Sequence, residues 1–201
     1  MGKKKKIIIA IIIIVILIVG GFFSYKLFLY IKSAINNREY NAGEQSYTDA
    51  IAGSQNGKVL SKTERDQLYN NAISNLEIAQ QKDPKNLNIS YQLASAYQNT
   101  GDIDKSIESL IKISEQDNQN ANLFLTLGNL YRTKSDLGVT TDNYQKAISL
   151  NPNLIEAYIN LASVYEINLN QKDAAIKVLQ DGLSKNPDNN LLKQELERLN
   201  K

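Results

Sequence analysis

The feature of this sequence that most constrains its fold is a pattern of large and small side chains that returns every 34 residues. One set joins a large and a small residue to a tyrosine, at Leu93-Ala94 with Tyr97, Leu127-Gly128 with Tyr131, and Leu161-Ala162 with Tyr165. The other set places a small residue four positions before a bulky one, at Ala72 and Leu76, Ser106 and Leu110, Thr140 and Tyr144, and Ala175 and Leu179. A fixed period of this length predicts stacked copies of one supersecondary unit.

This spacing resembles the tetratricopeptide repeat family, whose unit is a helix-turn-helix. The fullest match comprises Phe124, Leu127, Gly128, Tyr131, Thr140, Tyr144, Ala147 and Pro152. The next unit matches at Tyr158, Leu161, Ala162, Tyr165, Ala175, Leu179, Gly182 and Pro187. The preceding unit departs from the pattern at Ile113 and Asn118. The resemblance implies an all-α fold, a right-handed α-solenoid of helix-turn-helix repeats.

The repeats suggest a division of the chain into four parts. These are residues 1–32, a basic tail and transmembrane helix; 33–60, a juxtamembrane helix and loop; 61–190, the array; and 191–201, a capping helix. The array divides into a partial unit, 61–86, and full units at 87–120, 121–154 and 155–189. The third full unit is predicted to hold one extra residue in its turn, between Ile167 and Lys172, which explains a single step of 35.

The segment before the array leaves two alternatives open. Tyr40, Tyr47 and Ile51 could form one face of a helix that opens a degenerate first repeat, with residues 52–57 as a loop. Alternatively, residues 33–60 form a flexible stalk. The helix that follows is clearer, because Ser61 and Glu64 have the spacing of a capping box. That helix is expected to run to about residue 82.

The N-terminal segment predicts a membrane anchor. Ile7 to Phe23 is a run of 17 residues without a charged or strongly polar side chain, and residues 27–31 lengthen it. Such a run approaches the length needed to span a bilayer. A buried core helix and a cleaved signal peptide are the alternatives, but the run has no clear cleavage site. Four adjacent lysines, Lys3 to Lys6, predict a cytoplasmic N-terminus and an extracytoplasmic repeat domain.

Composition argues against several classes of function. The chain has neither Cys nor His, so it lacks thiolate metal ligands and the commonest general base. Residues from Arg38 onward carry a net charge of −4, with 17 basic and 21 acidic side chains, which argues against nucleic acid as a partner. Asp102, Asp104 and Glu108 lack the spacing of a calcium loop. We therefore expect no enzymatic activity, cofactor or metal.

The expected function is binding of a protein or an extended peptide in the groove that the family forms from the first helix of each unit. The candidate groove residues are Asn88, Tyr91, Gln92, Ser95, Asn122, Leu125, Thr126, Asn129, Arg132, Glu156, Ile159, Asn160 and Ser163. Asn129 and Asn160 can each donate to and accept from a peptide backbone. The sequence thus predicts a membrane-anchored interaction module at the outer face of the cytoplasmic membrane. The alternative is a structural envelope protein that self-associates.

Overall fold

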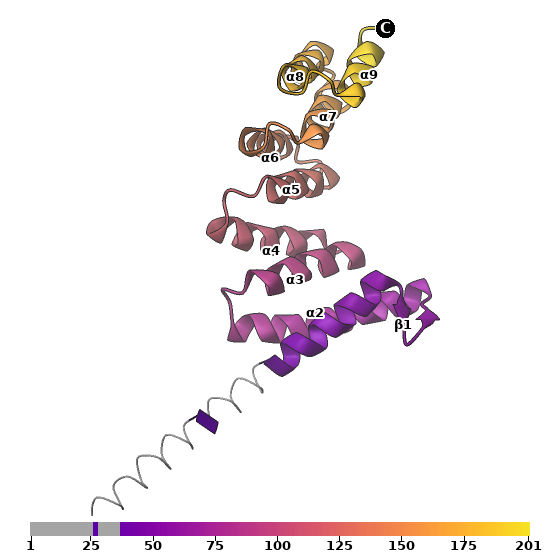
Figure 1. The fold of residues 1–201 in the computed structure, drawn as a ribbon, viewed down its shortest axis with the longest axis vertical. Helices are drawn as coiled ribbons and strands as arrows, with labels where there is room; N and C mark the ends of the chain where they lie inside the picture. The colour runs from indigo at the N-terminus through magenta and orange to yellow at the C-terminus, as the bar shows by residue number, and fades with distance from the viewer. Residues whose placement is uncertain (1–25, 28–36) are drawn as a thin grey trace, which may run out of the picture. The chain divides into compact units, whose positions relative to one another are not determined.

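The computed structural model describes residues 26–27 and 37–201, and the helices follow one another in pairs (Figure 1). The described residues divide into two compact units, with the boundary between Ala96 and Tyr97, and the two are treated separately below. The boundary falls within α3, Leu87–Thr100.

The first unit opens with a helical segment, residues 37–52, whose partner is α2, Lys62–Lys82. A short hairpin joins them, with β1, Ser54–Gln55, antiparallel to β2, Lys58–Val59. The turn residues Asn56 and Gly57 have φ angles of 51° and 77°, as a two-residue hairpin turn with right-handed strand twist requires. The expected loop at residues 52–57 is therefore partly a hairpin.

The pairing of residues 37–52 with α2 depends on a close contact between a glycine and a leucine. A Cβ atom on Gly43 would lie 2.7 Å from Cγ of Leu76, so a larger residue would force the two helices apart. Tyr47 and Tyr69 meet edge to face, with ring centroids 6.4 Å apart. The predicted capping box at the start of α2 is confirmed, because Ser61 and Glu64 bond to each other's backbone N–H.

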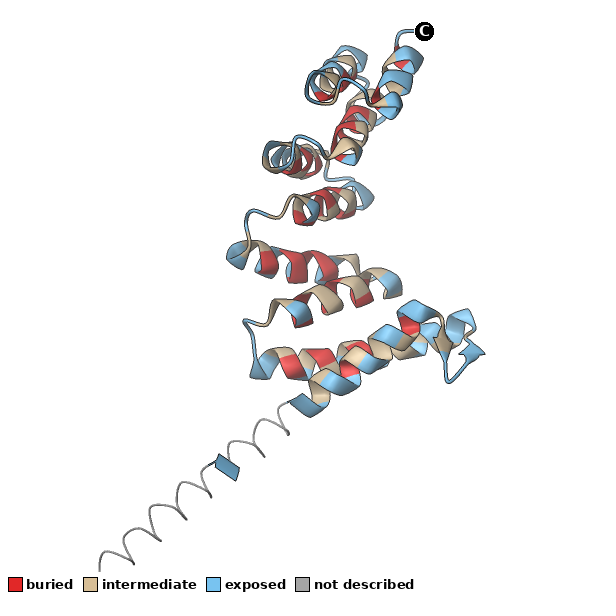
Figure 2. Ribbon diagram, viewed as in Figure 1, coloured by how far each residue is buried: buried red, intermediate tan, exposed pale blue. Residues whose placement is uncertain are grey.

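The second unit continues the alternation of helices from the end of α3. Its elements are α4, Ile103–Gln116; α5, Ala121–Thr133; α6, Leu137–Leu150; α7, Ile155–Ser163; η1, Val164–Asn168; α8, Lys172–Lys185; and α9, Asn190–Leu199. Short polar side chains cap four of them, since Asp102, Asn120, Asp136 and Asn189 each accept a hydrogen bond from the first turn. Figure 2 shows buried residues gathered on the facing sides of the helices.

The core of the second unit forms where small residues allow helices to approach. A Cβ atom on Gly128 of α5 would lie 2.5 Å from the ring of Tyr144 on α6. Tyr144 is fully buried and packs with Ala147 and with Leu161 of α7. The small-and-large pattern read from the sequence is therefore a set of helix–helix contacts.

The extra residue of the third full unit lies partly in a wide helical turn. Residues 164–168 form a π-helix, in which the Leu169 N–H donates to the Val164 carbonyl. The Gln171 N–H reaches the Tyr165 carbonyl across six positions, whereas the Asp136 N–H reaches the Tyr131 carbonyl across five. The extra residue was predicted to lie in the turn between Ile167 and Lys172. That prediction places it too late in the chain, because the π-helix that accommodates it begins at Val164.

The last helix covers the end of α8. Leu192 and Leu199 of α9 are buried in a cluster with Leu179, while Leu191 remains 58% exposed. A polar outer surface is what a terminal repeat requires, and Leu191 departs from it.

The predicted membrane segment, residues 7–31, lies outside the described residues except for Lys26 and Leu27. Within the part of the chain that the structure describes, none of the helices combines the length and apolar character needed to cross a bilayer.

Candidate peptide-binding face

Two asparagines on the first helices of neighbouring repeats are joined by a hydrogen bond. Nδ2 of Asn160 on α7 donates to Oδ1 of Asn129 on α5 at 3.0 Å. The same oxygen accepts the hydroxyl of Tyr144, which crosses from α6 at 2.6 Å. We call Asn129 and Asn160 the amide pair. Their positions, 31 residues apart, meet because successive repeats stack their first helices side by side.

Each member of the amide pair keeps one polar atom for an external partner. Nδ2 of Asn129 and Oδ1 of Asn160 have no hydrogen-bond partner in the described structure, and neither atom is buried. The face therefore offers a donor from α5 beside an acceptor from α7. These are the two groups that the main chain of an extended peptide requires.

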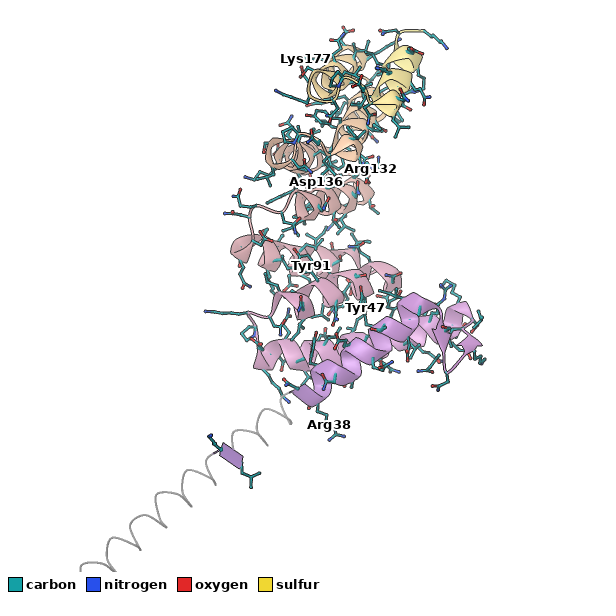
Figure 3. The ribbon with its side chains drawn as sticks, in the orientation of Figure 1. Arg38, Tyr47, Tyr91, Arg132, Asp136 and Lys177 are labelled. Carbon is teal, nitrogen blue, oxygen red and sulfur yellow. The ribbon has the colours of Figure 1, made fainter. Side chains whose placement is uncertain are left out.

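Two charged side chains of opposite sign flank the amide pair. Arg132 lies one turn beyond Asn129 on α5 and is exposed, and its side chain is labelled in Figure 3. Glu156 lies one turn before Asn160 on α7 and is also exposed. Burial raises the pKa of the Tyr144 hydroxyl; Arg132 opposes this shift and Glu156 adds to it. Both charges are thus felt at the hydroxyl that contacts the pair.

The helix α9 contributes a third charged group to this side of the unit. Arg198 donates two hydrogen bonds to the Glu166 carboxylate, at 2.9 and 2.6 Å, and one to Glu195 at 2.9 Å. The arginine holds the pKa of Glu166 below its usual value. A cavity of about 220 Å³ lies beneath, between α7, α8 and α9. Glu166 is therefore neutralised locally, unlike Glu156.

The other predicted residues of the second unit differ in their availability. Asn122 is exposed, and Thr126 is half-buried with its hydroxyl bonded to the Asn122 carbonyl at 2.9 Å. Ile159 and Ser163 are half-buried and line the 220 Å³ cavity. Leu125 was wrongly placed on the binding face. It is only 7% exposed, because it packs into the core against α6 and α7.

The predicted residues of the first unit differ in how far they are exposed. Asn88 is exposed, and Tyr91, Gln92 and Ser95 are half-buried. The Gln92 amide lies against Tyr40 of the opening helix and lowers the pKa of its hydroxyl, although burial makes the net shift upward. Gln92 Oε1 is buried without a hydrogen-bond partner among the described residues. Gln92 thus faces the protein more than a ligand.

Sequence reasoning missed Tyr144 and Arg198 as parts of this face. A signal for Tyr144 existed, because the other second helices carry Leu at its place and a buried tyrosine hydroxyl needs a partner. No comparable signal pointed to Arg198, since pairing it with Glu166 requires knowing how α9 returns toward α7.

A larger hollow of about 500 Å³ lies elsewhere in the second unit. It is bounded by α6 and α8, with Tyr158 and Leu161 of α7 also lining it. None of the predicted groove residues lines this hollow. Among the described residues, no group of three or more acidic side chains could hold a metal ion.

Comparisons with known proteins agree with the repeat architecture. Two family models described as tetratricopeptide repeat match residues 65–130 and 143–177, together about half of the chain. The chain belongs to the tetratricopeptide repeat family. None of the curated proteins compared with it matches. The two family models confirm the predicted helical-repeat fold.

Solved structures support the same fold. The crystal structure of MamA protein has a TM-score of 0.63 and 22% identity, over 82% of this chain and 80% of that one. Another MamA crystal structure has a TM-score of 0.58 and 25% identity, over 69% and 80%. Tetratricopeptide repeat domains generally mediate protein–protein interactions through extended surfaces, and the fold is generally not that of an enzyme.

Proposed function

We propose that this chain is a membrane-anchored tetratricopeptide repeat module that holds an extended segment of a protein partner across α5 and α7. The observation that carries the proposal is the amide pair, which presents an accessible donor beside an accessible acceptor. Main-chain recognition of this kind gives affinity without requiring one sequence. Arg132 and Glu156 would then favour segments with charges complementary to theirs.

The binding test uses peptides selected from a displayed random dodecapeptide library against the full chain in detergent. Fluorescence anisotropy then compares the wild type with the Asn129→Ala/Asn160→Ala double variant. We expect binding to weaken at least tenfold, because two main-chain hydrogen bonds are lost. Gln180→Ala, on the exposed surface of α8, is the matched control and should bind like the wild type. Equal binding by the double variant would refute the assignment.

The membrane anchor and the orientation rest on the apolar run and the lysines of the N-terminal segment. The natural chain has no cysteine, so a Ser184→Cys variant carries a single thiol on an exposed position. The proposal predicts that an impermeant thiol reagent labels this variant on intact cells. Labelling only after lysis would reverse the orientation, and recovery of the chain in the soluble fraction would remove the anchor.

A second proposal is a structural role through self-association, and the exposed Leu191 on the terminal helix favours it. Sedimentation equilibrium of the full chain in detergent tests this directly. A monomer at all concentrations would exclude self-association, whereas a dimer that Leu191→Gln dissociates would support it.

A further inference from the structure

Tyr144 differs from the residues at the same place in the other second helices. Leu76, Leu110 and Leu179 occupy that place, so only the unit that contains α5 and α6 has a hydroxyl there. The whole side chain is buried, with its ring against Gly128 and its hydroxyl bonded to Asn129 of the amide pair. The tyrosine therefore connects the helix–helix core to the face proposed to bind a partner.

The hydrogen of the Tyr144 hydroxyl has an acceptor in only one orientation of the Asn129 amide. As observed, the hydroxyl donates to Oδ1 at 2.6 Å. If the amide turned over, Nδ2 would face the hydroxyl, and the phenolic hydrogen would have no acceptor at a site closed to solvent. A buried donor without a hydrogen bond costs free energy. The buried hydroxyl thus selects the orientation of Asn129.

The orientation of Asn129 in turn selects that of Asn160. Oδ1 of Asn129 accepts from Nδ2 of Asn160 at 3.0 Å, so the acceptor of Asn160 is left toward solvent. Without the hydroxyl, both amides could turn over together and still keep one hydrogen bond between them. That exchange would place the donor on α7 and the acceptor on α5.

We infer that Tyr144 is a positioning residue that fixes the direction in which a peptide lies on this face. The inference rests on the proposed function. In an extended chain, the N–H and C=O of one residue point to the same side, and the N–H comes first. When one peptide residue makes both bonds, its N–H donates to Oδ1 of Asn160 and its C=O accepts from Nδ2 of Asn129. The N-terminal end of the peptide then lies toward α9 and its C-terminal end toward α5.

The first experiment measures affinity for the selected dodecapeptide. Tyr144→Phe keeps the ring against Gly128 and removes only the oxygen, and we expect it to weaken binding about fivefold, as the loss of one orienting hydrogen bond predicts. Tyr165→Phe is the matched control. Its hydroxyl accepts from Gln145 at 3.3 Å, away from the amide pair, so its affinity should equal that of the wild type.

The second experiment measures direction. An Asn200→Cys variant carries an acceptor dye just after α9, and the peptide carries a donor dye at one end or the other. Energy transfer should be stronger from the N-terminally labelled peptide, and this difference should shrink when Tyr144→Phe is added. A structural role for Tyr144 alone would not change the difference between the two labels.

The outcomes separate this inference from the proposed function. If the Asn129→Ala/Asn160→Ala variant binds like the wild type, the proposed function fails. If that variant loses binding while Tyr144→Phe retains both affinity and the direction of energy transfer, only the present inference is overturned. Stronger transfer from the C-terminal label in the wild type would also overturn it.

Discussion

The pair formed by residues 37–52 and α2 resembles the pair formed by α5 and α6 in one respect and differs in most others. In both, a glycine on the first helix receives a large side chain from the second, Leu76 on Gly43 and Tyr144 on Gly128. The connections are unlike, because a β-hairpin joins one pair and a short polar turn the other. The glycine contact thus sets the pairing of the helices, while the connection is free to vary.

The second difference concerns polarity. Leu76 ends in carbon, whereas Tyr144 carries a hydroxyl that bonds to Asn129 at 2.6 Å. One position can therefore serve packing alone in one pair, and packing together with a polar contact in the other. Where the large residue is apolar, as at Leu76, its side chain has no hydroxyl that could fix the orientation of a neighbouring amide.

The largest expected effect comes from filling the shared contact. Gly128→Val and Gly43→Val should each lower the free energy of unfolding by about 2–3 kcal/mol, because a side chain would overlap buried Tyr144 or Leu76. Urea unfolding followed by circular dichroism measures this. Gly138→Ala is the control, since nothing lies within 4 Å of the added carbon. A harmless Gly43→Val would show that the two pairs do not share this contact.

A smaller effect should follow from making the two pairs alike. Tyr144→Leu gives α6 the residue that α2 has at the same place, and leaves a gap beside Gly128 and Asn129. We expect a loss of about 2 kcal/mol in the free energy of unfolding from incomplete refilling of the core. A loss near zero would mean that the ring and hydroxyl contribute nothing to packing.

The caps of the two pairs should contribute about equally. Ser61→Ala on α2 and Asn120→Ala on α5 should each cost about 1 kcal/mol in thermal or urea unfolding, because each removes an acceptor for the first turn. The stabilising contributions of the two caps should differ in their dependence on pH, because the cap of α2 includes the carboxylate of Glu64. Bonding to Lys58 and Ser61 lowers the pKa of Glu64 from 4.5 to about 2.

The sign of that pH dependence follows from the lowered pKa. The contribution of Glu64 is complete above pH 4.5 and is lost as the pH falls through about 2, because the unfolded chain binds the proton first. We expect the free energy of unfolding to fall less between pH 6 and pH 2 in the Glu64→Gln variant than in the wild type. An equal fall in both proteins would show that Glu64 does not cause this pH dependence.

The smallest effect belongs to an ion pair found in the opening pair. Lys82 of α2 donates to Glu39 at 2.8 Å and lowers the pKa of that carboxyl. Its stabilising contribution is present above the ordinary carboxyl pKa and is lost on acidification. Glu39→Gln should change the free energy of unfolding only slightly, and less at high salt than at low salt. A large loss that salt does not reduce would indicate a packing role.

Much of the helical architecture could be predicted, because it depends on residues close in sequence or on a simple period. The capping box of Ser61 and Glu64 is local, and it is present as expected. The small residues Ala72 and Thr140 are fully buried, as their recurrence indicated. The hairpin at residues 54–59 was harder to predict, since its strands are two residues long and too short to show an alternating pattern.

The candidate site was predicted less well than the fold. Asn129 and Asn160 were identified because amides suit a peptide backbone, but their mutual bond was not. Leu125 was misplaced because helical spacing alone does not separate the edge of the core from the exposed face. Burial of a border residue depends on the neighbouring helices, in this instance α6 and α7.

The sequence by itself determined the repeat period, the small-and-large pattern and the start and end of α2, because these depend on side-chain volume and on local capping. Only the tertiary structure decided where the extra residue of the third full unit goes, and how the hydroxyl of Tyr144 meets Asn129 and Asn160. The physical reason is distance along the chain. A hydrogen bond across 15 or 31 residues exists only after helices have packed, and stacking decides which donor meets which acceptor.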